Sequence, residues 1–254
     1  MKRTKGGNLV NSYLRPPIVE AVVEFLTNSP ISFDDLQAMS NKVAGDYKNQ
    51  TIEKGIEVRI DTLGGAATIH SDQTPDRFRR TSDDQADIVI FADTSLIVAR
   101  AAPYPGWDVL SERIRKNWRI WSKGQSGRGV VRLGARFINR IDIPINGEER
   151  IELSDYLNLL PQIPNISDKP MSTFLVQASM PTANPHWDCN IMSTIVAPSP
   201  LLNHMSILLD IDVFRMRDIP SKSADVLAIL EEARPLKNTI FERCITDRAR
   251  DLFR

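Results

Sequence analysis

Charged side chains recur at regular spacing along two segments that alternate between polar and apolar residues. Arg132, Arg136 and Arg140 occupy every fourth position of one segment, which places them on one face of a strand at intervals of about 13 Å. Glu20 and Glu24 repeat this spacing near the N-terminus. Arginines aligned in this way can bind a carboxylate, a phosphate or a nucleic-acid backbone. They can also pair with carboxylates on neighbouring strands, which is the interpretation we favour.

A second basic group surrounds an aromatic residue. Arg77, Arg79 and Arg80 flank Phe78, and such interleaving suits contact with a phosphate backbone and a base. The two aspartates that follow at 83 and 84 oppose that reading. We expect residues 71–85 to form an exposed loop, and nucleic-acid binding there stays an alternative.

Recognised catalytic and metal-binding motifs are missing from the chain. His186 and Cys189 form a lone H-x-x-C pair, whereas a zinc site needs three or four ligands. The glycine-rich run 124–129 follows a predicted helix and precedes a strand, which is the reverse of a phosphate-binding loop. We therefore expect no metal, no cofactor and no catalytic residue. An enzyme using Glu20 with Arg140 is a third hypothesis, which nothing beyond polarity supports.

Strands and helices must position these groups, and their pattern predicts an α+β fold of mostly antiparallel sheets packed against helices. Strands are expected at 18–26, 87–91, 96–101, 130–143, 173–180, 190–197 and 204–216, and residues 55–70 are expected to form one or two strands with a turn or bulge at Gly64-Gly65. Helices are expected from about residue 34 to Tyr47, from Trp107 to Ser122, and from about Ser223 to Phe253 with a kink at Pro235.

Two of these elements carry the clearest patterns. Five apolar residues, Trp107, Leu110, Ile114, Trp118 and Trp121, follow one stripe of the second helix.

The strand over 130–143 presents an apolar face that contains one polar residue, Asn139. A polar side chain in such a place needs partners, so we predict that Asn139 is buried and hydrogen-bonded to the backbone.

Bulk properties limit the class of protein. Lys and Arg together number 32, as do Asp and Glu, so the formal net charge is zero. This balance disfavours non-specific attachment to nucleic acid or anionic lipid. Two separated cysteines and no long apolar run indicate a cytoplasmic protein without a membrane span. We expect a flexible N-terminus (1–14) and two α+β halves, 15–146 and 147–254, with the terminal helix in the second half.

Several segments, taken in order, resemble a sporadically distributed family of uncharacterised bacterial proteins. They are Pro16-Pro17-Ile-Val-Glu-Ala, Ile138-Asn139-Arg140-Ile-Asp142-Ile-Pro144, Leu209-Asp-Ile-Asp212-Val-Phe214, and Phe241-Glu242 followed by Ile245-Thr-Asp247. The resemblance implies a bacterial protein of patchy occurrence, a pattern that suits defence-associated loci. It supplies no catalytic residues.

From a well-patterned core without a catalytic constellation, we expect a non-enzymatic binding or regulatory component of a bacterial complex. It would act through protein–protein contacts, with a protein partner or as a homo-oligomer, and a role in antiviral defence or beside a toxin–antitoxin pair fits the resemblance. The alternative is nucleic-acid or nucleotide binding through the face of Arg132, Arg136 and Arg140.

Overall fold

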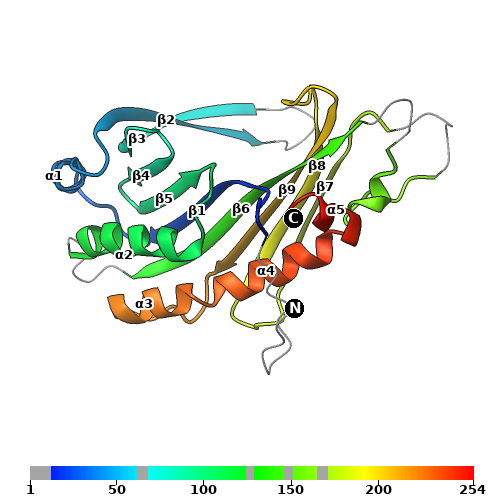
Figure 1. Cartoon of the computed structure of the whole chain (residues 1–254). Coiled ribbons are helices and arrows are strands. Elements are labelled where there is room, and N and C mark those ends of the chain that lie inside the picture. Colours follow the sequence, from blue (N-terminus) through cyan, green and yellow to red (C-terminus); the bar gives the residue numbers. More distant parts are fainter. Residues whose placement is uncertain (1–12, 62–67, 124–128, 146–150, 165–170) are drawn as a thin grey trace. The chain divides into compact units, whose positions relative to one another are not determined.

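The computed structural model describes residues 13–61, 68–123, 129–145, 151–164 and 171–254, although within this set it leaves the side chains of residues 55–61 and 68–76 undescribed. The fold is α+β, as the sequence predicts, with a large antiparallel sheet and covering helices (Figure 1).

The described residues form a sheet of nine strands in the order β2-β3-β4-β5-β1-β6-β9-β8-β7. They are β1 (Ile18–Thr27), β2 (Asn49–Asp61), β3 (Thr68–Thr81), β4 (Asp87–Phe91), β5 (Ser95–Ala101), β6 (Val130–Pro144), β7 (Leu175–Pro181), β8 (Asp188–Val196) and β9 (His204–Arg215). The helices are α1 (Phe33–Lys42), α2 (Trp107–Lys123), α3 (Ser223–Leu230), α4 (Ala233–Cys244) and α5 (Asp247–Asp251), with a short 3-10 turn, η1, at Leu153–Asp155.

The chain packs into two compact units that interleave along the sequence. Unit 1 takes residues 1–22, 102–105 and 133–254, and unit 2 takes 23–101 and 106–132. The division into contiguous halves at residue 146 stays a prediction.

Unit 2 is built around aromatic side chains. Trp118 of α2 lies 4.4 Å from Phe25 of β1, measured between ring centres, and Trp121 packs beside it. All five apolar residues of the predicted stripe on α2 are buried, which confirms that prediction. The first helix of this unit, α1, begins at the N-cap Ser32, whose hydroxyl accepts a hydrogen bond from the backbone N–H of Asp35.

Unit 1 contains strands β6, β9, β8 and β7 and the C-terminal helices. Its core lies on the apolar face of β6 and β9, and α4 packs against β9. Asn139 is 3% exposed, and its amide donates to the carbonyls of Phe137 and Leu209 at 3.2 and 3.0 Å. The prediction of a buried, backbone-bonded Asn139 is confirmed.

The C-terminal helical segment bends where the sequence predicts. The helix α3 ends at Leu230, α4 begins at Ala233, and Pro235 lies in the first turn of α4, where its missing N–H costs nothing. A second break follows Cys244, and Thr246 caps α5 by accepting a hydrogen bond from the Ala249 N–H.

Two local predictions are wrong. Residues 71–85 do not form an exposed loop, because β3 extends to Thr81 and carries a fully buried Phe78 and a buried Arg80. The first helix ends at Lys42 and not near Tyr47, because Val43 leaves the helical conformation (φ −100°, ψ 2°) and the chain turns at 43–46.

Candidate functional site

The arginines of β6 are each paired with a carboxylate. Arg132 contacts Glu24 at 2.7 Å within unit 2. In unit 1, Arg140 bonds to Asp142 at 3.0 Å. Both contacts are ion pairs on the polar face of the sheet, and such pairs are expected where charges of opposite sign lie side by side.

Arg136 holds its partner most closely. Its Nε lies 3.0 and 2.9 Å from the two carboxylate oxygens of Asp210, and its Nη2 contacts the same carboxylate. The hydrogen bonds to Asp210 raise the pKa of Arg136, and the charges of Asp212 and Glu20 act in the same direction. Acidic groups therefore surround this guanidinium, which disfavours a polyanion at this face.

A small polar hollow of about 210 Å³ lies beside Arg136, between Asn190, Asp210 and Asp212. Within the described part of the chain, no ion pair joins Glu20 to Arg140. The structure thus keeps the predicted strand face together but shows its arginines engaged with carboxylates.

In the second predicted basic group, two arginines are ion-paired and the third is hydrogen-bonded to neutral groups. Arg77 and Arg79 both contact Glu53 on the neighbouring strand, at 3.0 and 3.6 Å. Arg80 is 5% exposed and donates to the Ser40 hydroxyl at 2.7 Å and to the carbonyl of Tyr47.

Burial lowers the pKa of Arg80, and its contacts tie β3 to the end of α1. Its role in the structure is therefore packing support for unit 2.

Unit 2 also contains a polar hollow of about 600 Å³ between the turn after α1, the loop after β3 and one face of α2. Asp87 lies in its wall, 3% exposed, and accepts hydrogen bonds from Arg100 at 2.8 Å and from Arg113. Asn117 donates to the Tyr47 hydroxyl at 2.9 Å. Burial raises the pKa of Tyr47, so the phenol is neutral at pH 7.

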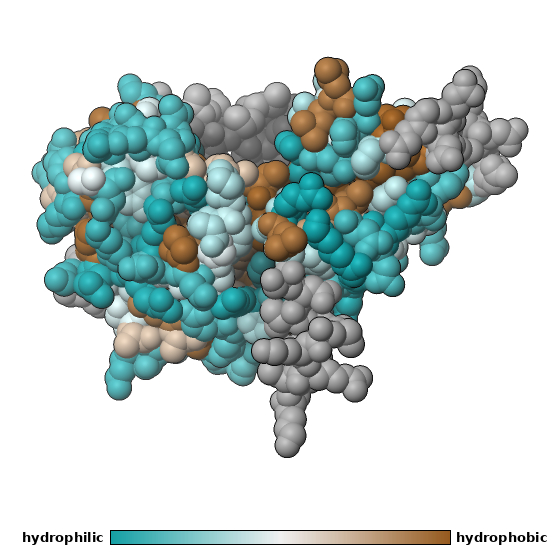
Figure 2. Space-filling model, in the orientation of Figure 1, coloured by the Kyte–Doolittle hydropathy of each residue, from teal (hydrophilic) through white to brown (hydrophobic). Residues whose placement is uncertain are grey.

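The site that sequence reasoning missed lies in unit 1 and has two parts. The first is the edge strand β7, which pairs with β8 and has no described strand on its other side. Its sequence, LVQASMP, carries no charged residue. Leu175 is 65% exposed and Met180 is 42% exposed, and hydrophobic side chains reach the surface in this region of the sheet (Figure 2).

The second part is an apolar pocket of about 270 Å³, here called the edge pocket, between β7, β8 and α4. One face of α4 supplies a wall, because its lining residues follow helical spacing: Leu236, Thr239, Ile240, Arg243 and Cys244. The opposite wall contains Met180 and Cys189, which are cross-strand partners, and Ile191.

Both cysteines of the chain line the edge pocket and both are free and buried. Burial raises the pKa of the Cys244 thiol to about 11, and burial followed by the Asp188 charge raises that of Cys189. Reactive cysteines need a lowered pKa, so these neutral thiols serve as apolar wall.

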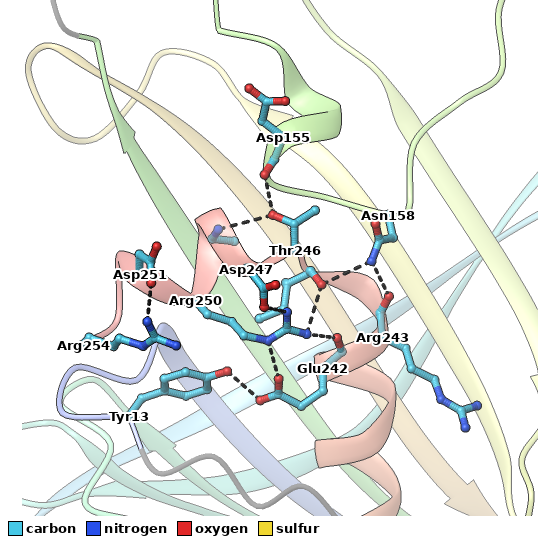
Figure 3. A network of polar contacts seen from close by, with 12 residues as sticks. Tyr13, Asp155, Asn158, Glu242, Arg243, Thr246, Asp247, Arg250, Asp251 and Arg254 are labelled. Carbon is cyan, nitrogen blue, oxygen red and sulfur yellow. Dashed lines mark hydrogen bonds and ion pairs between the residues drawn. The ribbon is translucent and has the colours of Figure 1, made fainter. Parts of the chain in front are cut away.

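A network of polar contacts fixes the rim of the edge pocket (Figure 3). Arg250 bonds to Glu242 at 2.8 Å, and Tyr13 donates to the same carboxylate at 2.6 Å. The amide of Asn158 donates to the carbonyls of Arg243 and Ile245. The last turn of α4 is therefore held in place, while the Arg243 side chain points away from the network.

Among the described residues, no group of three or more His, Cys, Asp or Glu side chains is placed to hold a metal. Within the described ranges, no helix is long and apolar enough to cross a membrane.

Comparison with known proteins adds little. No family model matches the chain, and no curated protein matches it. One solved structure, the di-domain ARO/CYC protein BexL from the BE-7585A biosynthetic pathway, aligns over 92% of this chain and 98% of its own. Its identity is 9% and its TM-score 0.21, so it carries no argument about fold or function. The resemblance to a sporadically distributed bacterial family stays a prediction.

Proposed function

We propose that the protein is a non-enzymatic binding component that works within a protein complex, and that β7 is its docking strand. The observation that carries this proposal is the uncharged, exposed edge of β7. Natural edge strands are usually protected by charges, proline or a bulge, because an open edge pairs with other strands. In β7 only the terminal Pro181 offers such protection.

The occupant that fits this edge is a second copy of the chain. A two-fold axis at Ala178 would place β7 antiparallel to its own copy, so that Val176 faces Met180 and Gln177 faces Ser179. Apolar side chains then meet on the core side of the sheet, where Ala178 lies beside Ile191. Polar side chains meet on the other side, and no like charges are opposed.

The test is the oligomeric state in solution. Size-exclusion chromatography with light scattering should give a dimer of the 28.6 kDa chain at micromolar concentration. Ala178→Lys brings two ammonium groups together on the axis and should give a monomer. Gln177→Lys combined with Ser179→Lys should do the same from the exposed face, without touching the core.

Gln37→Lys on the exposed surface of α1 adds the same charge away from β7 and serves as the control. It should leave the dimer intact. A wild-type chain that stays monomeric, or dimers that tolerate the β7 lysines, would refute the proposed docking strand.

A further inference from the structure

Arg243 is the one charged residue among the described residues that line the edge pocket. Its side chain is exposed at the mouth and has no ion-pair or hydrogen-bond partner among the described residues. Figure 3 shows it directed away from the neighbouring network. A single positive charge beside an apolar wall favours a ligand that has a negative group at one end.

Thr239 lies one helical turn before Arg243 on the same face of α4. Residues four apart on a helix are neighbours, so Thr239 and Arg243 present their side chains from one face of α4 to the pocket. Together they offer several hydrogen-bond donors, and a carboxylate has two oxygens that accept such bonds.

Deeper in the pocket the lining is apolar. Leu236 and Ile240 of α4 face Met180 and Ile191 of the sheet, and the neutral thiols complete the wall. The volume of about 270 Å³ lies just below the roughly 300–1,000 Å³ typical of small-molecule sites. The pocket therefore suits a short ligand.

We infer that the edge pocket binds a small amphipathic carboxylate, whose apolar body lies between α4 and the β7–β8 strands and whose carboxylate meets Arg243 and Thr239. The pocket shares Met180 with β7, but its binding of an acid does not depend on whether the chain dimerises. No bond is made or broken, because the thiols in the wall are protonated.

Isothermal titration with hexanoate, octanoate and decanoate, against octan-1-ol and octylamine as probes of equal apolar length, tests the inference. Saturable binding of one of the acids is expected, at least about tenfold tighter than that of the alcohol or the amine. Arg243→Gln should weaken binding of the acid about tenfold and leave the alcohol unchanged.

Arg254→Gln is the matched control, because it removes a charge at the exposed C-terminus outside the pocket. Ala183→Trp at the exposed part of the lining should block both acid and alcohol without disturbing the core.

Thiol labelling provides a second readout. Cys189 and Cys244 are the only cysteines of the chain and both line the pocket, so the acid should slow their reaction with a thiol reagent in the native protein. Gln177→Lys combined with Ser179→Lys, on the face of β7 opposite to the pocket-lining Met180, should bind the acid like wild type, which separates this result from that of the docking strand. The inference fails if acid and alcohol bind equally, if Arg243→Gln changes nothing, or if saturating acid leaves the thiols unprotected.

Discussion

The ammonium group of Lys237 lies 4.0 Å from the centre of the Phe137 ring, inside unit 1. Lys237 belongs to α4 and is 9% exposed. Burial, with a smaller contribution from the Arg234 charge, lowers the pKa of Lys237 to about 8. The ring face offsets part of the cost of burying the charge.

This lysine predicts an unusual pH dependence of stability. Below pH 8 both the folded and unfolded chains hold the proton, so Lys237 does not make the free energy of unfolding depend on pH. Between about 8 and its ordinary value of 10.5 the unfolded chain binds more protons, so the free energy of unfolding rises with pH. Lys237→Met should abolish the rise and stabilise the protein at pH 7 by on the order of 3 kcal/mol.

Urea unfolding at pH 7, 8 and 9 measures this effect. Higher pH is unsuitable, because the raised pKa of Cys244 gives the opposite slope above its ordinary value of 9.0. Equal slopes for wild type and Lys237→Met would contradict the burial of the ammonium.

Asp87 should be the costliest acidic residue to remove in unit 2. Its carboxylate is buried between Arg100, whose side chain is 11% exposed, and Arg113. Asp87→Leu removes a negative charge that balances the buried guanidinium of Arg100. It should lower the free energy of unfolding, measured in urea, by about 3 kcal/mol. Asp83→Leu, which breaks an exposed pair with Lys48, should cost less than about 1 kcal/mol. Similar losses in the two variants would argue against this account.

The strand face of β6 should not bind nucleic acid. Because Arg136 is held by Asp210 with Asp212 and Glu20 nearby, we expect no salt-dependent binding of labelled oligonucleotides at physiological ionic strength. Fluorescence anisotropy across a salt series measures this. Binding whose salt slope falls in Arg136→Ala would restore the nucleic-acid alternative.

Asn139 should contribute to stability through its amide donors. Asn139→Ala removes two hydrogen bonds to carbonyls and should cost about 1–3 kcal/mol. Asn139→Asp should cost more, because a carboxylate would face those carbonyls in a buried site. Thermal unfolding in which the aspartate variant matches wild type would show that the amide donors are unimportant.

Much of the fold was predictable because the apolar patterns are regular. The stripe of Trp107 to Trp121 on α2 and the alternation along β6 each specify one buried face. Asn139 was predictable for the same reason, since one polar residue interrupts an apolar face. The bend near Pro235 follows from the missing N–H of proline.

The burial of long polar side chains could not be predicted from these patterns. Arg80 lies inside unit 2 and Lys237 inside unit 1, whereas both residue types are usually exposed. The run Arg77 to Thr81 therefore looked like a loop although it is a strand. The charged face of β6 was predicted, but which carboxylate each arginine contacts depends on strand register.

The edge pocket was not predictable from sequence, because its walls come from distant parts of the chain. Cys189 and Cys244 look like two unrelated cysteines until β8 is placed beside α4. The exposure of β7 depends likewise on its end position in the strand order. No local signal in either segment gives these positions.

Met180 belongs both to the edge strand and to the wall of the edge pocket. A molecule in the pocket would therefore touch the strand on which a second copy would pair. If occupancy shifts Met180, the two binding events become thermodynamically linked, and each must change the affinity of the other by the same factor. The side chain of Met180 would then couple the occupancy of the pocket to the pairing of the two copies.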